Sequence, residues 1–327
     1  MSGLQFVTSN AKDSPYGDGS LDIRRSPWGD RLTELRESVL DLITGTSPQV
    51  LNELHDSNSD KKETGLEITA ELKRFMDMAK ISAMDEQGYF VDYDLLQESQ
   101  PYLEYRQKCS PRLRYFDPGT LSTPGEQLVF WINLYNALIM DGVIAKEITQ
   151  SVGSNPLRLL AFFRQTAYNV GGQRMNADDI EHGVLRGNRG HPMLPGPQFT
   201  STDPRLAWVV NPVDVRIHFA LNCAGRSCPP IQVYTAEDLD KQLGLAARNF
   251  VNADVYIDQQ ASRVHLSAIF KWFNADFGGQ QGVVDFLIEH LPDGERKSWL
   301  AENVGNISFH YKPYDWGLNS SDLGLAK

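Results

Sequence analysis

The chain has 327 residues, of which 41% are hydrophobic, enough apolar material to bury a core in one large domain or two modest ones. Its 31 Lys and Arg against 42 Asp and Glu give a formal net charge of −11, so phosphate backbones and anionic membrane surfaces would repel it. Nucleic acid is therefore not an expected partner.

The N-terminus lacks the basic stretch followed by an apolar stretch that marks a secretory signal. The most apolar run, around residues 130–140, is interrupted by Asn133, Tyr135 and Asn136, so we expect no membrane span. Three cysteines are too few for a disulfide framework in a chain of this size. These features together predict a soluble, cytoplasmic protein.

Three regions follow one another along the chain. Residues 1–27 are rich in Ser, Asp and Gly and predict a flexible tail. Residues 28–64 combine an amphipathic helix, with apolar residues at helical spacing, and a polar linker. Residues 65–322 are expected to form one domain.

Helices dominate the first part of that domain. Periodic apolar residues predict helices over 66–84 and 92–107. Pro124 stands where a first helical turn tolerates proline, and a longer helix is expected from there to about residue 147. This helix is apolar nearly all round, which is typical of a central helix.

The middle of the domain mixes turns, a short sheet and a long loop. Gly171 and Gly172 predict the turn of a hairpin. Asn176 can then cap a helix with acidic residues in its first turns. Residues 187–213 are rich in Pro, Gly and Arg and predict a long ordered loop, and loops of this length are often functional.

Alternating apolar residues over 215–221 predict a strand with His218 on its polar face. The elements expected after it are a helix from Thr235, two strands at about 254–257 and 263–266, helices over 267–277 and 282–291, and a strand over 307–312. Helices and short strands alternate without a βαβ rhythm. The predicted class is therefore α+β, a helix-rich single domain around a small, mainly antiparallel sheet.

Four segments resemble, in order, the motifs of the domain of unknown function 547 family. They are Phe130–Asn136, Gly171–Gly172 followed by Asp179–Arg186, His218–Pro230 and Tyr314–Asn319. Together they bracket roughly residues 90–320, most of the chain. The last motif usually carries serine where this chain has Gly317. The resemblance implies a shared fold and a shared site, but no particular reaction.

The predicted catalytic residues are Cys228, His218, Glu181 and Asn133. Cys228 lies in a tight loop whose backbone amides could point inward, and the nearby Arg226 could favour its thiolate. His218 is the candidate base for that thiol. Glu181 or an Asn side chain such as Asn133 could orient the imidazole, as the third member of a catalytic triad does.

The residues predicted to contribute binding contacts are His182, Arg186, Asn136, Ser227 and Arg226. A buried helix followed by a His-bearing strand is distantly similar to papain and transglutaminase folds, although those folds carry the cysteine on the helix. The Cys-x4-Cys spacing suits neither structural zinc nor a Cys-x-x-Cys redox pair, so no metal and no cofactor are expected. A metal site of His182, His218 and Cys228 is the minor alternative.

Two functional hypotheses follow. The first is a cysteine-dependent hydrolase or acyl transferase. The second is a non-catalytic protein-binding or scaffold domain, in which Cys223 and Cys228 are small buried hydrophobes while Asn133 and Asn136 satisfy loop backbone groups. Either hypothesis leaves the protein or small-molecule partner unidentified. The first requires the Cys228 sulfur within about 4 Å of an imidazole and open to a cleft.

Overall fold

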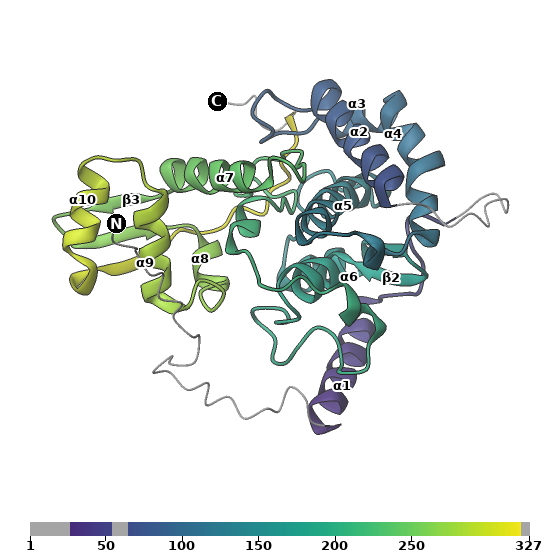
Figure 1. Cartoon of the computed structure of the whole chain (residues 1–327), viewed down its shortest axis with the longest axis horizontal. Coiled ribbons are helices and arrows are strands. Elements are labelled where there is room, and N and C mark those ends of the chain that lie inside the picture. Colours follow the sequence, from purple (N-terminus) through teal and green to yellow (C-terminus); the bar gives the residue numbers. More distant parts are fainter. Residues whose placement is uncertain (1–26, 54–64, 322–327) are drawn as a thin grey trace, which may run out of the picture.

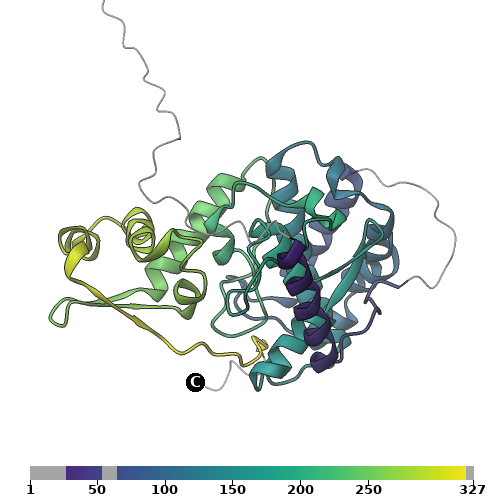
Figure 2. The same cartoon turned by 90° about the horizontal axis from the view of Figure 1, so that it is seen from below.

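The computed structural model describes residues 27–53 and 65–321. Within these residues two groups of elements lie side by side (Figure 1). Helices α1 to α6 and a β-hairpin form the larger group, and helices α7 to α10 and a three-stranded sheet form the smaller one, which extends to one side (Figure 2). This helix-rich arrangement with two small sheets confirms the α+β prediction.

The helices are α1 (Pro27–Thr44), α2 (Gly65–Ala83), α3 (Tyr93–Glu98), α4 (Gln100–Glu104), α5 (Pro124–Ala145), α6 (Pro156–Gln165), α7 (Leu239–Asp254), α8 (Ala268–Trp272), α9 (Gly279–His290) and α10 (Glu295–Glu302). The strands are β1 (Ala167–Val170), β2 (Gln173–Asn176), β3 (Tyr256–Asp258), β4 (Arg263–Leu266) and β5 (Ser308–Tyr311).

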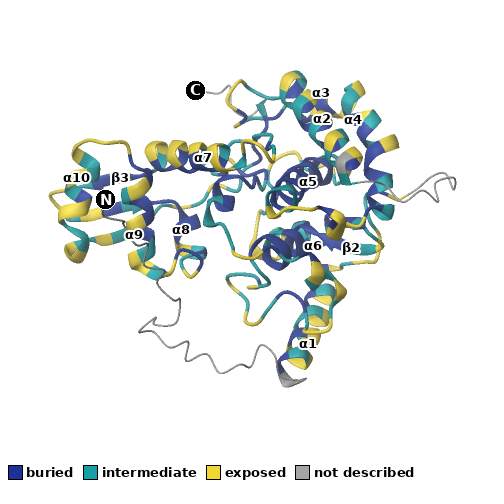
Figure 3. Ribbon diagram, viewed as in Figure 1, coloured by how far each residue is buried: buried dark blue, intermediate teal, exposed yellow. Residues whose placement is uncertain are grey.

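Helix α5 is the centre of the larger group. It begins with a capping box, in which Thr123 accepts from the Glu126 amide and Glu126 accepts from the Thr123 amide. Every residue from Leu128 to Val143 is buried, which confirms the predicted central helix (Figure 3). Its length and composition would also allow it to cross a membrane, contrary to the sequence expectation. However, 89% of its most apolar stretch is buried inside the protein, as in the core helix of a soluble domain.

Helix α1 packs on the domain beside α6. Arg36 donates hydrogen bonds to the backbone oxygens of Pro195 and Pro197, both at 2.6 Å. Arg164 of α6 forms an ion pair with Glu37 at 2.9 Å. Helix α1 therefore holds part of the long loop that follows β2 in place.

The strands form two separate sheets instead of the single sheet that was predicted. β1 and β2 make the predicted antiparallel hairpin, with Gly171 and Gly172 both at positive φ in the turn. In the second sheet β3 and β4 are antiparallel, whereas β4 and β5 are parallel.

The strand predicted over 215–221 is wrong. Val215–Phe219 forms a 3₁₀ turn, because the Asp214 side chain accepts a hydrogen bond from the Arg216 amide and starts a turn locally. No strand pairs with this segment among the described residues. The expected similarity to papain and transglutaminase folds depended on a His-bearing strand, and His218 is not on one.

Other boundaries also differ from the predictions. α6 and α10 were not predicted, the helix expected from Thr235 starts at Leu239, and the helix expected over 267–277 ends at Trp272. The predicted tail, apart from residue 27, and most of the polar linker lie outside the described residues.

The buried side chains form two clusters. The larger one surrounds α5. The smaller one belongs to α7 to α10, and Phe219 reaches into it to stack on Phe286 with ring centroids 5.4 Å apart. The candidate site lies where the two groups of elements meet.

Candidate functional site

A cavity of about 350 Å³ opens between the two groups of elements. Its apolar lining includes Leu159, Leu160, Phe163, Met193, Leu194, Leu221, Ile269, Trp272, Phe273 and Trp316. Only a few polar side chains interrupt this lining. A largely apolar cavity of this size with a few converging polar groups is typical of a site for a small molecule.

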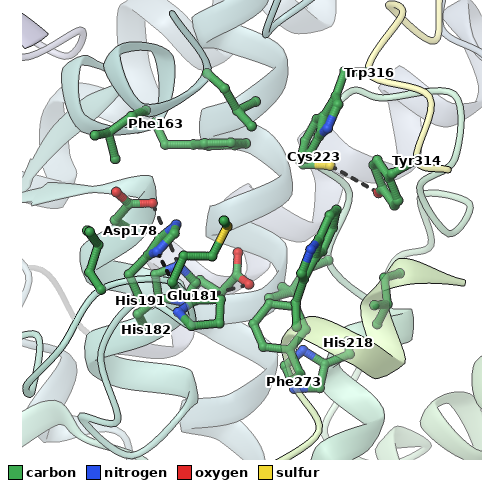
Figure 4. Close-up of a pocket in the computed structure, with 18 of the residues that line it drawn as sticks. Phe163, Asp178, Glu181, His182, His191, His218, Cys223, Phe273, Tyr314 and Trp316 are labelled. Carbon is green, nitrogen blue, oxygen red and sulfur yellow. Dashed lines mark hydrogen bonds and ion pairs between the residues drawn. The ribbon is translucent and has the colours of Figure 1, made fainter. Parts of the chain in front are cut away.

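The polar groups gather on two sides of the cavity (Figure 4). One side carries Asp178, Glu181, His182 and His191, and the other carries Cys223 and Tyr314. Carboxyl and imidazole groups thus share an apolar space with a thiol.

A π-helical turn, Asp179–Leu185, brings Glu181 and His182 to the cavity together. On an ordinary α-helix two adjacent residues point about 100° apart, so only one of them would face a site. Asn176 fixes the start of the turn, since its side chain accepts from the Asp179 amide at 2.7 Å. π-Helical segments of this kind occur frequently at functional sites.

Glu181 and Asp178 are carboxyl groups held in an apolar setting. The Tyr135 hydroxyl donates to Glu181 Oε2 at 2.9 Å. Burial raises the pKa of Glu181, although Arg186 and the Tyr135 hydrogen bond oppose it. Burial likewise raises the pKa of Asp178 well above its ordinary range, and His182 Nε2 lies 3.8 Å from Asp178 Oδ1, beyond hydrogen-bond distance. Both groups therefore favour the protonated form.

His182 is fixed in one tautomer. Arg186 Nη1 lies 3.0 Å from His182 Nδ1, and because arginine only donates, Nδ1 accepts and Nε2 carries the proton. Burial and the Arg186 charge hold the pKa of His182 well below its ordinary value. Burial also lowers the pKa of His191 to about 4. Both imidazoles are therefore neutral near neutral pH.

His218 belongs to a buried ion-pair network. Its Nε2 lies 3.0 Å from Asp276 Oδ2, and its ring stacks on Phe273 with centroids 3.9 Å apart. Arg186 Nε binds the same carboxylate oxygen at 2.6 Å, and Arg186 Nη1 donates to the Gly190 carbonyl. Hydrogen bonds from His218 and Arg186 outweigh burial and hold the pKa of Asp276 well below its usual range. His218 thus joins the two groups of elements.

Cys223 and Cys228 lie together on the other side. The Cys223 amide donates to Cys228 Sγ at 3.2 Å, and the Tyr314 hydroxyl is 3.1 Å from Cys228 Sγ and 3.4 Å from Cys223 Sγ. Cys223 lines the main cavity, whereas Cys228 is buried and lines a second cavity. No described imidazole is hydrogen-bonded to either sulfur, so the predicted contact between His218 and Cys228 is not formed in this structure.

The pKa values of the two thiols shift in opposite directions. A hydrogen bond to Cys228, and burial after it, raise the pKa of Cys223 well above its ordinary value. Burial alone would raise the pKa of Cys228, but hydrogen bonds from Cys223 and Tyr314 outweigh burial and lower it. Cys228 is therefore the first of the pair to become a thiolate.

The two predicted asparagines bind loop backbone. Asn133 donates to the Tyr234 carbonyl at 3.0 Å and accepts from the Tyr234 amide at 3.1 Å. Asn136 donates to the Ala220 carbonyl at 3.0 Å and accepts from the Asn222 amide at 2.9 Å. Neither lines the main cavity. Asn136 instead fixes Asn222, at the start of the loop that carries Cys223 and Cys228.

Ser227 and Arg226 hold the C-terminal motif beside the cysteines. The Asp315 amide donates to Ser227 Oγ at 2.9 Å, and the Arg226 amide donates to the Gly317 carbonyl at 2.9 Å. The Arg226 guanidinium lies 3.8 Å from the Asp315 carboxylate. These contacts position Tyr314 against the two sulfurs.

Sequence reasoning missed several residues of the site, namely Tyr135, Asp178, His191, Asp276 and Tyr314. Tyr135 and Tyr314 lie inside the quoted motifs, so the motifs themselves could have identified them. Asp276 lies outside every motif. Over residues 27–53 and 65–321, no group of three or more His, Cys, Asp or Glu side chains is arranged to hold a metal ion.

The fold and the site define a helix-rich α+β domain with a thiol pair and buried carboxyl groups around one cavity. Residues 107–251, a little under half of the chain, match the family described as "Protein of unknown function, DUF547". This match is to the same family that the motifs resemble. Three of the four motifs lie inside the matched residues, and Tyr314–Asn319 lies beyond them. No curated protein and no solved structure matches the chain.

Proposed function

We propose that the cavity is the active site of a thiol-dependent hydrolase or acyl transferase, with Cys223 as the attacking sulfur and Cys228 as its proton acceptor. The observation that carries this proposal is the thiol pair itself, held against the Tyr314 hydroxyl at the wall of an apolar cavity. Cys228 keeps a catalytic role under this proposal, as the base that accepts the proton of Cys223 and not as the nucleophile. His218 is not assigned as the base, because its Nε2 is engaged by Asp276.

The first step is acylation of the thiol. The Cys223 proton moves to the Cys228 thiolate as the Cys223 sulfur bonds to the carbonyl carbon of the substrate. Glu181, whose pKa is raised by burial, gives its proton to the leaving group as the bond to the carbonyl carbon breaks. The products are an acyl-Cys223 thioester, a Cys228 thiol and a Glu181 carboxylate.

The second step returns the site to its starting state. A water molecule, or the acceptor of an acyl transfer, gives a proton to Glu181 and attacks the thioester carbonyl. The Cys223 sulfur leaves and takes the proton back from Cys228. The site carries one negative charge throughout, first on Cys228 and then on Glu181.

The Tyr135 hydroxyl contacts the carboxyl side of the cavity. It donates to Glu181, and burial is the main cause that raises its pKa. Glu181, Tyr135 and Cys223 all line the same cavity, which supports placing the acid and the thiol within one reaction site. The apolar lining supports a small acyl group as the part of the substrate that enters.

Turnover of p-nitrophenyl esters tests the proposal. Wild-type protein should release p-nitrophenol with saturation kinetics, and Cys223→Ser should abolish that release. Cys109→Ala is the matched control, because Cys109 is as buried as Cys228 but lies outside the cavity. Turnover that survives Cys223→Ser would exclude Cys223 as the nucleophile.

A non-catalytic binding domain is the second candidate. Met193 lines the cavity and is 74% exposed, and an exposed apolar side chain there favours a partner surface. Saturable binding of a protein partner, together with no ester turnover in any variant, would favour this candidate over the enzyme.

A further inference from the structure

A Cys-x4-Cys spacing does not suggest a redox pair, yet the fold brings these two sulfurs together. Both lie within hydrogen-bond distance of a single hydroxyl, that of Tyr314, at 3.1 and 3.4 Å. The Cys223 amide also donates to the Cys228 sulfur. Two cysteines whose sulfurs share one hydroxyl, and which are joined by an amide–sulfur hydrogen bond, are neighbours of the kind that a disulfide links.

We propose that Cys223 and Cys228 form a reversible disulfide on reaction with a hydroperoxide. The thiol pair is thus an oxidation site, in addition to its proposed role in acyl chemistry and independent of it. In this structure neither cysteine is in a disulfide, which is the reduced form of the pair.

The chemistry balances with a hydroperoxide as the oxidant. The Cys228 thiolate attacks the peroxide, so that a sulfur–oxygen bond forms, the oxygen–oxygen bond breaks, and the alkoxide or hydroxide leaves and takes a proton from solvent. The Cys223 thiol then attacks the sulfenic sulfur, a disulfide forms, and water leaves with the Cys223 proton. The two cysteines lose two electrons and the peroxide gains them.

Both cysteines border cavities that a small oxidant can enter. Cys223 lines the main cavity, and Cys228 lines the second cavity, of about 370 Å³, together with Arg226 and Lys312. Hydrogen bonds from Cys223 and Tyr314 stabilise the Cys228 thiolate, the form that reacts with peroxide. Cys223, next to it, is placed as the resolving thiol.

Cys109 supplies an internal comparison. It is 5% exposed, close to the 4% of Cys228, and it also lines a shallow surface cavity. It lies on a different part of the fold, the π-helical turn Tyr105–Cys109. Burial alone therefore predicts equal reactivity for Cys109 and Cys228, whereas the pairing predicts that Cys228 oxidises at least ten-fold faster.

The test is peptide mapping of the full chain after brief exposure to hydrogen peroxide. Arg226 lies between the two cysteines, so trypsin leaves their disulfide as a link between two peptides that mass spectrometry detects directly. The proposal predicts this linked pair, its loss on treatment with a thiol reductant, and an unchanged Cys109. In Cys223→Ser, Cys228 should instead accumulate as a sulfenic acid that dimedone traps.

Three results would overturn the proposal. They are oxidation of Cys228 to sulfinic acid in wild-type protein without the linked peptides, oxidation of Cys109 at the same rate as the pair, and a disulfide that forms only after unfolding. Tyr314→Phe provides a second variant, since loss of the shared hydroxyl should slow the formation of the linked pair while the protein stays folded.

Discussion

Replacing Arg186 by methionine should destabilise the protein far more than the same change at Arg189, although both arginines bind Asp276. The Arg186 side chain is 4% exposed and its Nε lies 2.6 Å from Asp276 Oδ2. The Arg189 side chain is 40% exposed and its Nη1 lies 2.9 Å from Oδ1 of the same carboxylate. The Asp276 side chain is fully buried, so the two substitutions compare a buried and an exposed partner of one group.

The magnitudes follow from burial. Breaking a buried ion pair costs about 3–5 kcal/mol, because the remaining charge stays buried without its partner. Asp276 keeps His218 and Arg189 when Arg186 is lost, so we expect about 3 kcal/mol for Arg186→Met. Losing a pair with one exposed partner costs about 1 kcal/mol or less, which is the expectation for Arg189→Met.

Urea unfolding followed by circular dichroism at pH 7 measures both free energies of unfolding. Because the pKa of Asp276 is depressed in the folded protein, its ion pairs stabilise the protein above the ordinary aspartate pKa, and that contribution is lost as the pH falls. The difference in free energy of unfolding between wild-type protein and Arg186→Met should therefore become smaller in acid. Equal costs for the two substitutions at pH 7 would refute this account of the network.

Three further predictions concern single groups. Asp178→Asn should stabilise the protein by about 1 kcal/mol at pH 8 and hardly at pH 4. Because folding raises the pKa of Asp178, the carboxyl costs stability as the pH rises above the ordinary aspartate pKa, where the unfolded chain ionises first. A melting temperature of the variant below that of wild-type protein at pH 8 would contradict this. His191→Gln should lessen the loss of stability in acid. Because folding lowers the pKa of His191 to about 4, this group costs stability as the pH falls from 6.5, on the order of 3 kcal/mol at pH 4. Urea midpoints measured across that range test this, and an unchanged dependence of the midpoint on pH would exclude His191 as the cause. Asn136→Ala should lower the free energy of unfolding by about 2–3 kcal/mol, because the Ala220 carbonyl and the Asn222 backbone amide both lose a buried partner. A loss below about 0.5 kcal/mol would mean that water replaces the Asn136 side chain.

Much of the fold could be predicted from local patterns. The central helix followed from Pro124 and its continuous apolar run, and the hairpin followed from Gly171 and Gly172, because each signal acts within a few residues. The strand predicted around His218 failed because alternation was read without a partner strand, while the Asp214 cap favoured a turn.

The site was predictable only in its parts. The motifs contain Glu181, His182, Cys223 and Cys228. The first three line one cavity, and Cys228 lies against Cys223 and lines a second cavity. Sequence could not show that Asp276, ninety residues beyond Arg186, engages His218, since that contact arises only when the two groups of elements pack together. The positions of the two cysteine sulfurs likewise depend on the Tyr314 hydroxyl, which comes from much later in the chain.

The acyl-cysteine intermediate tests the central claim most directly. Wild-type protein mixed with a p-nitrophenyl ester, quenched in acid and mapped by mass spectrometry should carry one acyl group, on Cys223, and Cys228→Ser should form it at least ten-fold more slowly. An acyl group found on Cys109 or on lysines, or none at all while Cys223 remains reduced, would contradict a thiol-dependent reaction in this cavity.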